Sequence, residues 1–141
     1  MVGLVVATHG RLAEELVSTA EQIVGKLPAV VTCAIEPGAS PEEIRERLCA
    51  AIASVDQGQG VVVLADLFGG SPCTQALTLC GKRPLEVVTG VNLPILLKAG
   101  SLREEGLPLP ELAETLAQYG RKNITCATAL LRAAGAERPH S

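Results

Sequence analysis

The chain has 141 residues, the size of one domain, and 48% of them are apolar, which is enough for one hydrophobic core. Its only aromatic residues are Phe68 and Tyr119, so aliphatic side chains and alanine must fill that core. This composition favours a β-sheet of branched residues covered by helices rich in alanine and leucine. The net charge of −3, without a basic block and with few rings to stack on bases, argues against nucleic acid as a partner.

The cysteines predict free thiols in a reducing compartment. None of them forms a Cys-x-x-Cys pair, and no histidine accompanies them at metal-ligand spacing. We therefore expect no disulfide framework, no metal site and no cofactor. The apolar run at residues 2–7 lacks a basic lead-in and is too short for a signal or membrane-spanning segment. These features predict a cytoplasmic protein that does not insert directly into a membrane.

The first half of the chain alternates between two patterns. Short runs rich in β-branched residues predict buried strands, and apolar residues that repeat every three or four positions predict amphipathic helices. Strands are expected at residues 2–7, 30–35 and 61–65, and helices at 12–24 and 41–55. Gly25 and Pro28 are typical of the end of the first helix, whereas Ser40, Pro41 and Glu43 predict a capped start for the second.

The second half continues this alternation into an ambiguous carboxyl-terminal segment. We expect a helix over residues 71–80, a strand over 85–89, a short helix through Leu97 and Lys98, and a helix from Pro110. Residues 123–131 predict a fifth strand, with a helix as the competing interpretation because of their alanines and leucines. The predicted domain covers residues 1–131, and a flexible tail is expected at 132–141.

Strands that alternate with helices at this spacing predict a doubly wound α/β fold with a mostly parallel sheet. In such a sheet, ligands bind beyond the carboxyl ends of the strands, where the strand order reverses. The residues expected at that edge are Thr8 and His9 after the first strand, Asp66, Gly69, Gly70 and Ser71 after the third, and Asn92 after the fourth.

His9 and Asp66 form the chemical centre of this predicted site. Imidazole titrates at about pH 6.5, so His9 can act as a nucleophile near neutral pH, and a carboxylate bonded to one ring nitrogen would leave the other free. Gly69 and Gly70 permit close backbone approach, and the first amides of the following helix can hold an anion such as phosphate. Each feature alone is more often a turn or a helix cap. Together they predict a phosphoryl-transfer site.

Three ordered motifs, VVATHGRLAEELVSTAEQIVG, VVVLADLFGGSPCTQAL and EVVTGVNLPILLKA, resemble the mannose-family enzyme IIA domain of the bacterial sugar phosphotransferase system. The resemblance runs over nearly the whole chain. It implies that His9 accepts a phosphoryl group from phospho-HPr and passes it to a histidine of a IIB component. It also implies that Asp66 hydrogen-bonds this histidine. The phosphoryl group would be held by Gly69, Gly70 and Ser71, and the site would be lined by Thr8 and Asn92.

The same resemblance implies four parallel strands and a fifth, antiparallel strand that the subunits of a homodimer exchange. Without a linker to a IIB domain, the chain is expected to be a separate IIA polypeptide. Two alternatives stay open: a stand-alone regulatory phosphoprotein of the same system, and the phosphotransfer subunit of a dihydroxyacetone kinase. The GGSP and GVNLP motifs argue against the kinase subunit. A nucleotide-binding module is disfavoured because no P-loop lysine follows the glycines.

Overall fold

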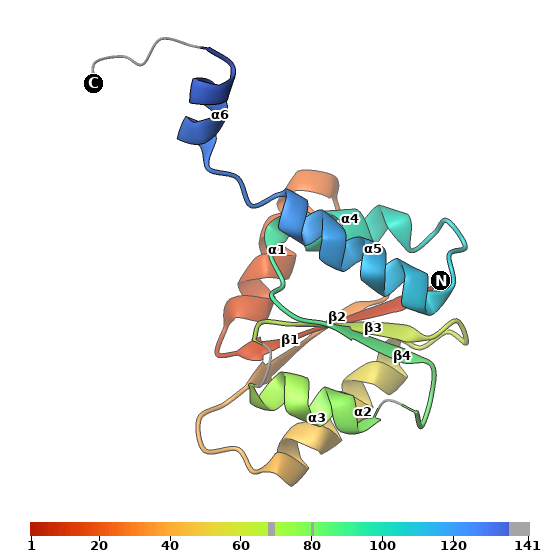
Figure 1. Cartoon of the computed structure of the whole chain (residues 1–141). Coiled ribbons are helices and arrows are strands. Elements are labelled where there is room, and N and C mark those ends of the chain that lie inside the picture. The colour runs from red at the N-terminus through yellow and green to blue at the C-terminus, as the bar shows by residue number, and fades with distance from the viewer. Residues whose placement is uncertain (68–69, 80, 136–141) are drawn as a thin grey trace.

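The computed structural model describes residues 1–67, 70–79 and 81–135, and a four-stranded parallel sheet lies at its centre (Figure 1). The strands are β1 (Gly3–His9), β2 (Val30–Ile35), β3 (Val61–Ala65) and β4 (Leu85–Val88). They pair in parallel in the order β2-β1-β3-β4, so the strand order reverses between β1 and β3. This arrangement confirms the predicted doubly wound α/β fold with four parallel strands.

Helices cover both faces of this sheet. On one face lie α1 (Leu12–Val24), α4 (Leu93–Leu102) and α5 (Leu109–Lys122), and on the other lie α2 (Pro41–Val55) and α3 (Ser71–Leu79) (Figure 1). Side chains of β1 alternate between the two cores. Leu4 and Val6 pack with the group around α1, α4 and α5, and Val5 and Ala7 pack with the group around α2 and α3.

Polar side chains cap two of these helices at their first turns. At the start of α2, Ser40 Oγ accepts a hydrogen bond from the Glu43 N–H at 3.1 Å, as the sequence predicts. At the start of α4, Asn92 Oδ1 accepts one from the Ile95 N–H at 2.9 Å. Such bonds satisfy amides that have no partner inside the helix, so they fix where each helix begins.

The carboxyl-terminal segment differs from its prediction. The strand expected at residues 123–131 is wrong for this chain, because Ala127–Ala133 forms the short helix α6, none of whose residues is buried (Figure 1). Alanine and leucine are strong helix formers, and no described strand pairs with this segment to favour an extended backbone. Residues 132 and 133 of the predicted tail belong to α6, and 136–141 lie outside the described residues. The domain range 1–131 stays a prediction.

The cysteines that the structure describes, Cys33, Cys49, Cys73 and Cys126, are free thiols, whereas Cys80 lies outside the described residues. Within the described ranges, no helix combines the length and the apolar character needed to cross a bilayer.

Candidate functional site

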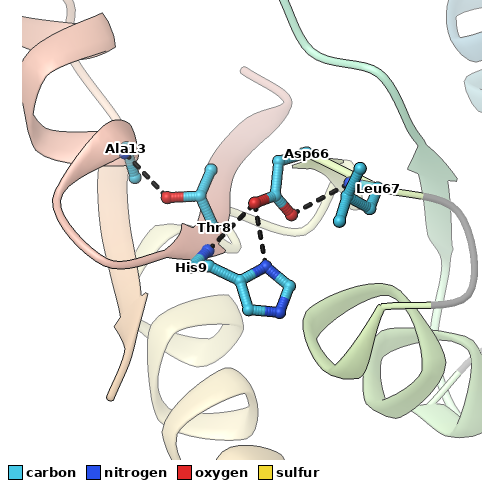
Figure 2. Close-up of polar contacts among 5 residues, drawn as sticks. All are labelled: Thr8, His9, Ala13, Asp66 and Leu67. Atoms are coloured by element: carbon cyan, nitrogen blue, oxygen red, sulfur yellow. Dashed lines mark hydrogen bonds and ion pairs between the residues drawn. The ribbon is translucent and has the colours of Figure 1, made fainter. Parts of the chain in front are cut away.

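The structure brings His9 and Asp66 together at the carboxyl edge of the sheet, at the reversal of strand order. The β1–β3 ladder ends at the pair Ala7 and Ala65, two residues before His9 and one before Asp66. Beyond this point the Asp66 side chain bonds to β1 (Figure 2). Its Oδ2 lies 3.1 Å from the backbone nitrogen of His9 and 2.9 Å from ring atom Nδ1. One carboxylate oxygen therefore holds both the backbone and the ring of His9.

The carboxyl group of Asp66 favours its ionised form. Burial raises its pKa, but hydrogen bonds from the ring and backbone of His9, the electrostatic attraction of the His9 ring when it is protonated, and a bond from the Leu67 N–H outweigh that effect. The net pKa of Asp66 lies below its ordinary value. The ionised carboxylate can only accept hydrogen bonds, so Nδ1 of His9 must carry the hydrogen in this contact.

This tautomer leaves the Nε2 lone pair of His9 unprotonated in the neutral ring. In Figure 2, Nε2 lies on the side of the ring away from Asp66. The two side chains also differ in accessibility, because that of His9 is 48% exposed and that of Asp66 only 13%. The half-exposed ring thus combines a held nitrogen, Nδ1, with a second nitrogen, Nε2, whose lone pair can act as a nucleophile.

The start of α3 lies directly against the His9 ring. A Cβ atom added to Gly70 would stand 3.0 Å from ring atom Cε1 of His9, which is bonded to both ring nitrogens. The Gly70 carbonyl accepts the Thr74 N–H at 2.9 Å, so Gly70 immediately precedes the first turn of α3. Ser71, the first residue of α3, is exposed. The first amides of a helix carry partial positive charge, so this end of α3 suits an anion beside the ring.

The other predicted site residues do not all lie against the His9 ring. Gly69 lies outside the described residues. Thr8 is fully buried, and its Oγ1 accepts the Ala13 N–H of α1 at 2.8 Å (Figure 2). Asn92 is half-buried, and its Oδ1 caps α4. The bonds recorded for these two oxygens thus lead to helices and not to His9 or Asp66.

Sequence reasoning missed two backbone contributions to the site. The Leu67 N–H donates to Asp66 Oδ1 at 2.9 Å, and the Gly90 N–H donates to the Asp66 carbonyl at 3.2 Å. The first bond holds Asp66 from its own loop, and the second holds it from the loop after β4. A short Asp-containing turn after a buried strand is the signal for the first bond, since Asp side chains often accept from nearby backbone amides.

Comparisons with known proteins identify the family of this chain. The model of a family described as PTS system fructose IIA component (EIIA-man) matches residues 3–117. The PTS system mannose-specific EIIAB component of Escherichia coli (strain K12) is 33% identical over 124 residues, which make up 87% of this chain and 38% of that protein. This chain therefore spans well under half the length of that relative. The PTS system fructose-specific EIIA component of Bacillus subtilis (strain 168) is 28% identical, over 88% of this chain and 85% of that protein.

Solved structures have the same fold. A mannose/sorbose specific IIA subunit of the phosphotransferase system from Enterococcus faecalis superposes with a TM-score of 0.78 at 31% identity, covering 88% of this chain and 92% of that one. The phosphotransferase system component EIIA from Streptococcus agalactiae gives a TM-score of 0.83 at 23% identity, over 92% of this chain and 99% of that one, which is evidence of fold alone.

Proposed function

This chain belongs to the family described as PTS system fructose IIA component, the mannose and fructose type of EIIA component, and we propose that it carries a phosphoryl group on His9. EIIA components are phosphotransferase subunits, and the family therefore supports a general role in phosphotransfer. The observation that carries the specific proposal is the His9 ring, whose Nδ1 is bound to Asp66 at 2.9 Å while the side chain stays 48% exposed.

In the proposed reaction, Nε2 of neutral His9 attacks the phosphorus atom of phospho-HPr with its lone pair. A bond forms between phosphorus and Nε2, the bond between phosphorus and HPr breaks, and the electron pair of that bond stays with HPr. The phosphorylated ring is positively charged and keeps its hydrogen on Nδ1, where the Asp66 carboxylate stabilises the charge. The reverse exchange transfers the phosphoryl group to a IIB component of a sugar permease.

The backbone at the start of α3 is proposed to hold the transferred group. Gly70 lies against the ring, and Ser71 opens the helix whose first amides point outward. Gly69 and Asn92 are proposed to complete the set of residues around the phosphoryl group. Thr8 is proposed to support this site without touching the group, because its buried hydroxyl bonds to the Ala13 N–H. The proposal needs no metal or cofactor, because the backbone amides and Asp66 supply the electrostatic stabilisation.

We further propose that the protein acts in the cytoplasm as a homodimer. In the described part of the chain, β4 pairs only with β3. A groove of about 390 Å³ lies between the free edge of β4 and α5, with Ile124 at its rim. Ile124, which lines this groove, is 76% exposed, and Leu130 and Leu131 of the separate helix α6 are 61% and 56% exposed. An unpaired strand edge beside an exposed apolar side chain such as Ile124 is typical of a subunit interface. Light scattering after size exclusion should give twice the mass of the chain, and a monomer at micromolar concentration would reject this part.

The decisive experiment is phosphorylation with purified components. Incubation with phosphoenolpyruvate, enzyme I and HPr should add one acid-labile phosphate to the intact mass. His9→Ala should gain none, whereas His140→Ala, the matched change at the other histidine, should label like the wild type. Addition of a mannose-type IIB component should then remove the label. Failure of the wild type to gain phosphate from a competent HPr would reject the proposal.

A further inference from the structure

Thr8 stands next to His9 in sequence but on the opposite face of the sheet. Successive side chains of a strand alternate between faces, and Leu4 and Val6 of β1 belong to the core with α1, α4 and α5. Thr8 continues that row, whereas His9 continues the row of Val5 and Ala7 toward α2 and α3. Accordingly Thr8 bonds to Ala13 of α1, and the His9 ring contacts Gly70 beside α3.

The Thr8 hydroxyl caps α1 from within the strand. Arg11 occupies the N-cap position of α1, and its side chain makes no capping hydrogen bond. The Ala13 N–H donates instead to Thr8 Oγ1 at 2.8 Å, and both residues are fully buried. Without this hydroxyl, the Ala13 N–H would either become exposed to water or stay buried without a hydrogen-bond acceptor.

This bond closes a short turn around His9. Only Gly10 and Arg11 separate His9 from the first residue of α1, and Gly10 has a φ of +56°, a left-handed conformation that favours glycine. The turn is thus fixed on one side by Thr8 and Ala13, and on the other by Asp66 Oδ2, which accepts from the backbone and ring of His9.

We propose that Thr8 is a positioning residue that aims the His9 imidazole. By tying β1 to α1, its hydroxyl holds the backbone of His9 where one Asp66 oxygen can meet both the N–H and Nδ1. The consequence for transfer rests on the proposed function, while the effect on ring orientation does not. This role differs from the phosphoryl contact that the resemblance implies for Thr8, because the hydroxyl is buried on the side of α1.

Three variants test this role. Thr8→Val keeps the shape of the side chain but removes the acceptor, Thr8→Ser keeps the acceptor, and Ser40→Ala removes the comparable cap of α2 away from His9. In single-turnover transfer from phospho-HPr, Thr8→Val should be slower by about tenfold or more, since small misplacements of a reacting group are costly. Thr8→Ser should recover most of the rate, and Ser40→Ala should transfer like the wild type even if its melting temperature falls as much.

The second readout is the tautomer of His9, followed by two-dimensional ¹⁵N–¹H correlation of the imidazole nitrogens. The wild type should show hydrogen mainly on Nδ1, and Thr8→Val should shift toward a mixture of tautomers, whereas Thr8→Ser should not. An unchanged tautomer in folded Thr8→Val would overturn the proposal, as would equal rate losses in Thr8→Val and Ser40→Ala. Because this readout needs no phosphate donor, it decides the role of Thr8 even if the wild type is never phosphorylated.

Discussion

The amino edge of the sheet, where the parallel strands begin, and the carboxyl edge, where they end, use polar side chains for different purposes. At the amino edge, Arg103 at the end of α4 is only 4% exposed. Its guanidinium donates to the carbonyls of Val2 at 3.2 Å and Ala29 at 3.3 Å, and also to that of Pro28. At the carboxyl edge, His9 keeps an accessible nitrogen beside Asp66. A cation enclosed by backbone carbonyls serves the fold, whereas a half-exposed ring with one bound nitrogen remains free for chemistry.

The largest expected effect tests whether the amino edge contributes to stability and not to the chemistry at His9. Arg103→Ala leaves the carbonyls of Val2 and Pro28 without this donor, and we expect a loss of about 2–4 kcal/mol in the free energy of unfolding. Urea denaturation measures this loss. Phosphorylation of His9 should persist at temperatures where the variant is folded.

The matched control for this change is Arg83→Ala. The Arg83 side chain is 40% exposed and pairs with Asp56 at 3.5 Å, so its loss should cost about 0.5 kcal/mol. Equal losses from the two variants would contradict a structural role for the amino edge, and abolished labelling in folded Arg103→Ala would show that the two edges are coupled.

The next largest effect concerns the carboxylate of the carboxyl edge. Asp66→Asn keeps the shape of the side chain but removes the charge that we propose stabilises the phosphorylated ring. We expect transfer from phospho-HPr to slow by about 10- to 100-fold, with the fold intact by circular dichroism. Asp56→Asn, an isosteric change at a carboxylate that pairs with Arg83, serves as the control. If both variants transfer at the wild-type rate, Asp66 has no role in transfer.

A smaller effect is expected from the contact between Gly70 and the ring. In Gly70→Ala, the added Cβ would stand 3.0 Å from Cε1 of His9, so the ring must move by a few tenths of an ångström. We expect transfer to slow by roughly three- to tenfold through this misplacement. Gly100→Ala on α4 is the control, since its Cβ meets only the end of the Leu27 side chain. Equal transfer rates for both variants in rapid-quench measurements would contradict a role for Gly70 in the site.

The smallest effect is the acid dependence of stability. The pKa of Asp66 is lower in the folded chain than its ordinary value of about 3.9, so the folded protein binds fewer protons at this group than the unfolded chain. Its contribution to stability is therefore complete above that value and disappears as the pH falls through the folded pKa. Urea unfolding from pH 6 to pH 3 should show a steeper loss for the wild type than for Asp66→Asn. Parallel curves would contradict a lowered pKa.

Much of this architecture follows from the sequence alone. Runs of valine and leucine identified the four strands, because strands buried on both faces need continuous apolar residues. The parallel topology then brought His9 and Asp66 to one edge. The failure at residues 123–131 has a physical cause, since their alanines and leucines fit a helix and only tertiary neighbours could impose a strand.

Side-chain direction and long-range bonds were harder to predict than topology. Thr8 and His9 are adjacent in sequence, and only the alternation of the observed strand assigns them to different faces. Arg103 gave no signal, because its partners lie 74 to 101 positions away in the chain. The close approach of Gly70 to the ring likewise depends on how α3 packs and not on any local pattern.

The bond from the His9 amide to Asp66 Oδ2 has a consequence for hydrogen exchange. This amide lies just past the end of the β1–β3 ladder, and a side chain protects it instead of a strand carbonyl. Its exchange with deuterium should therefore be slow only while the carboxylate is in place, whereas amides deeper in β1 should stay protected regardless. The exchange rate of this one backbone proton thus reports, without any phosphate donor, whether Asp66 is bound to His9.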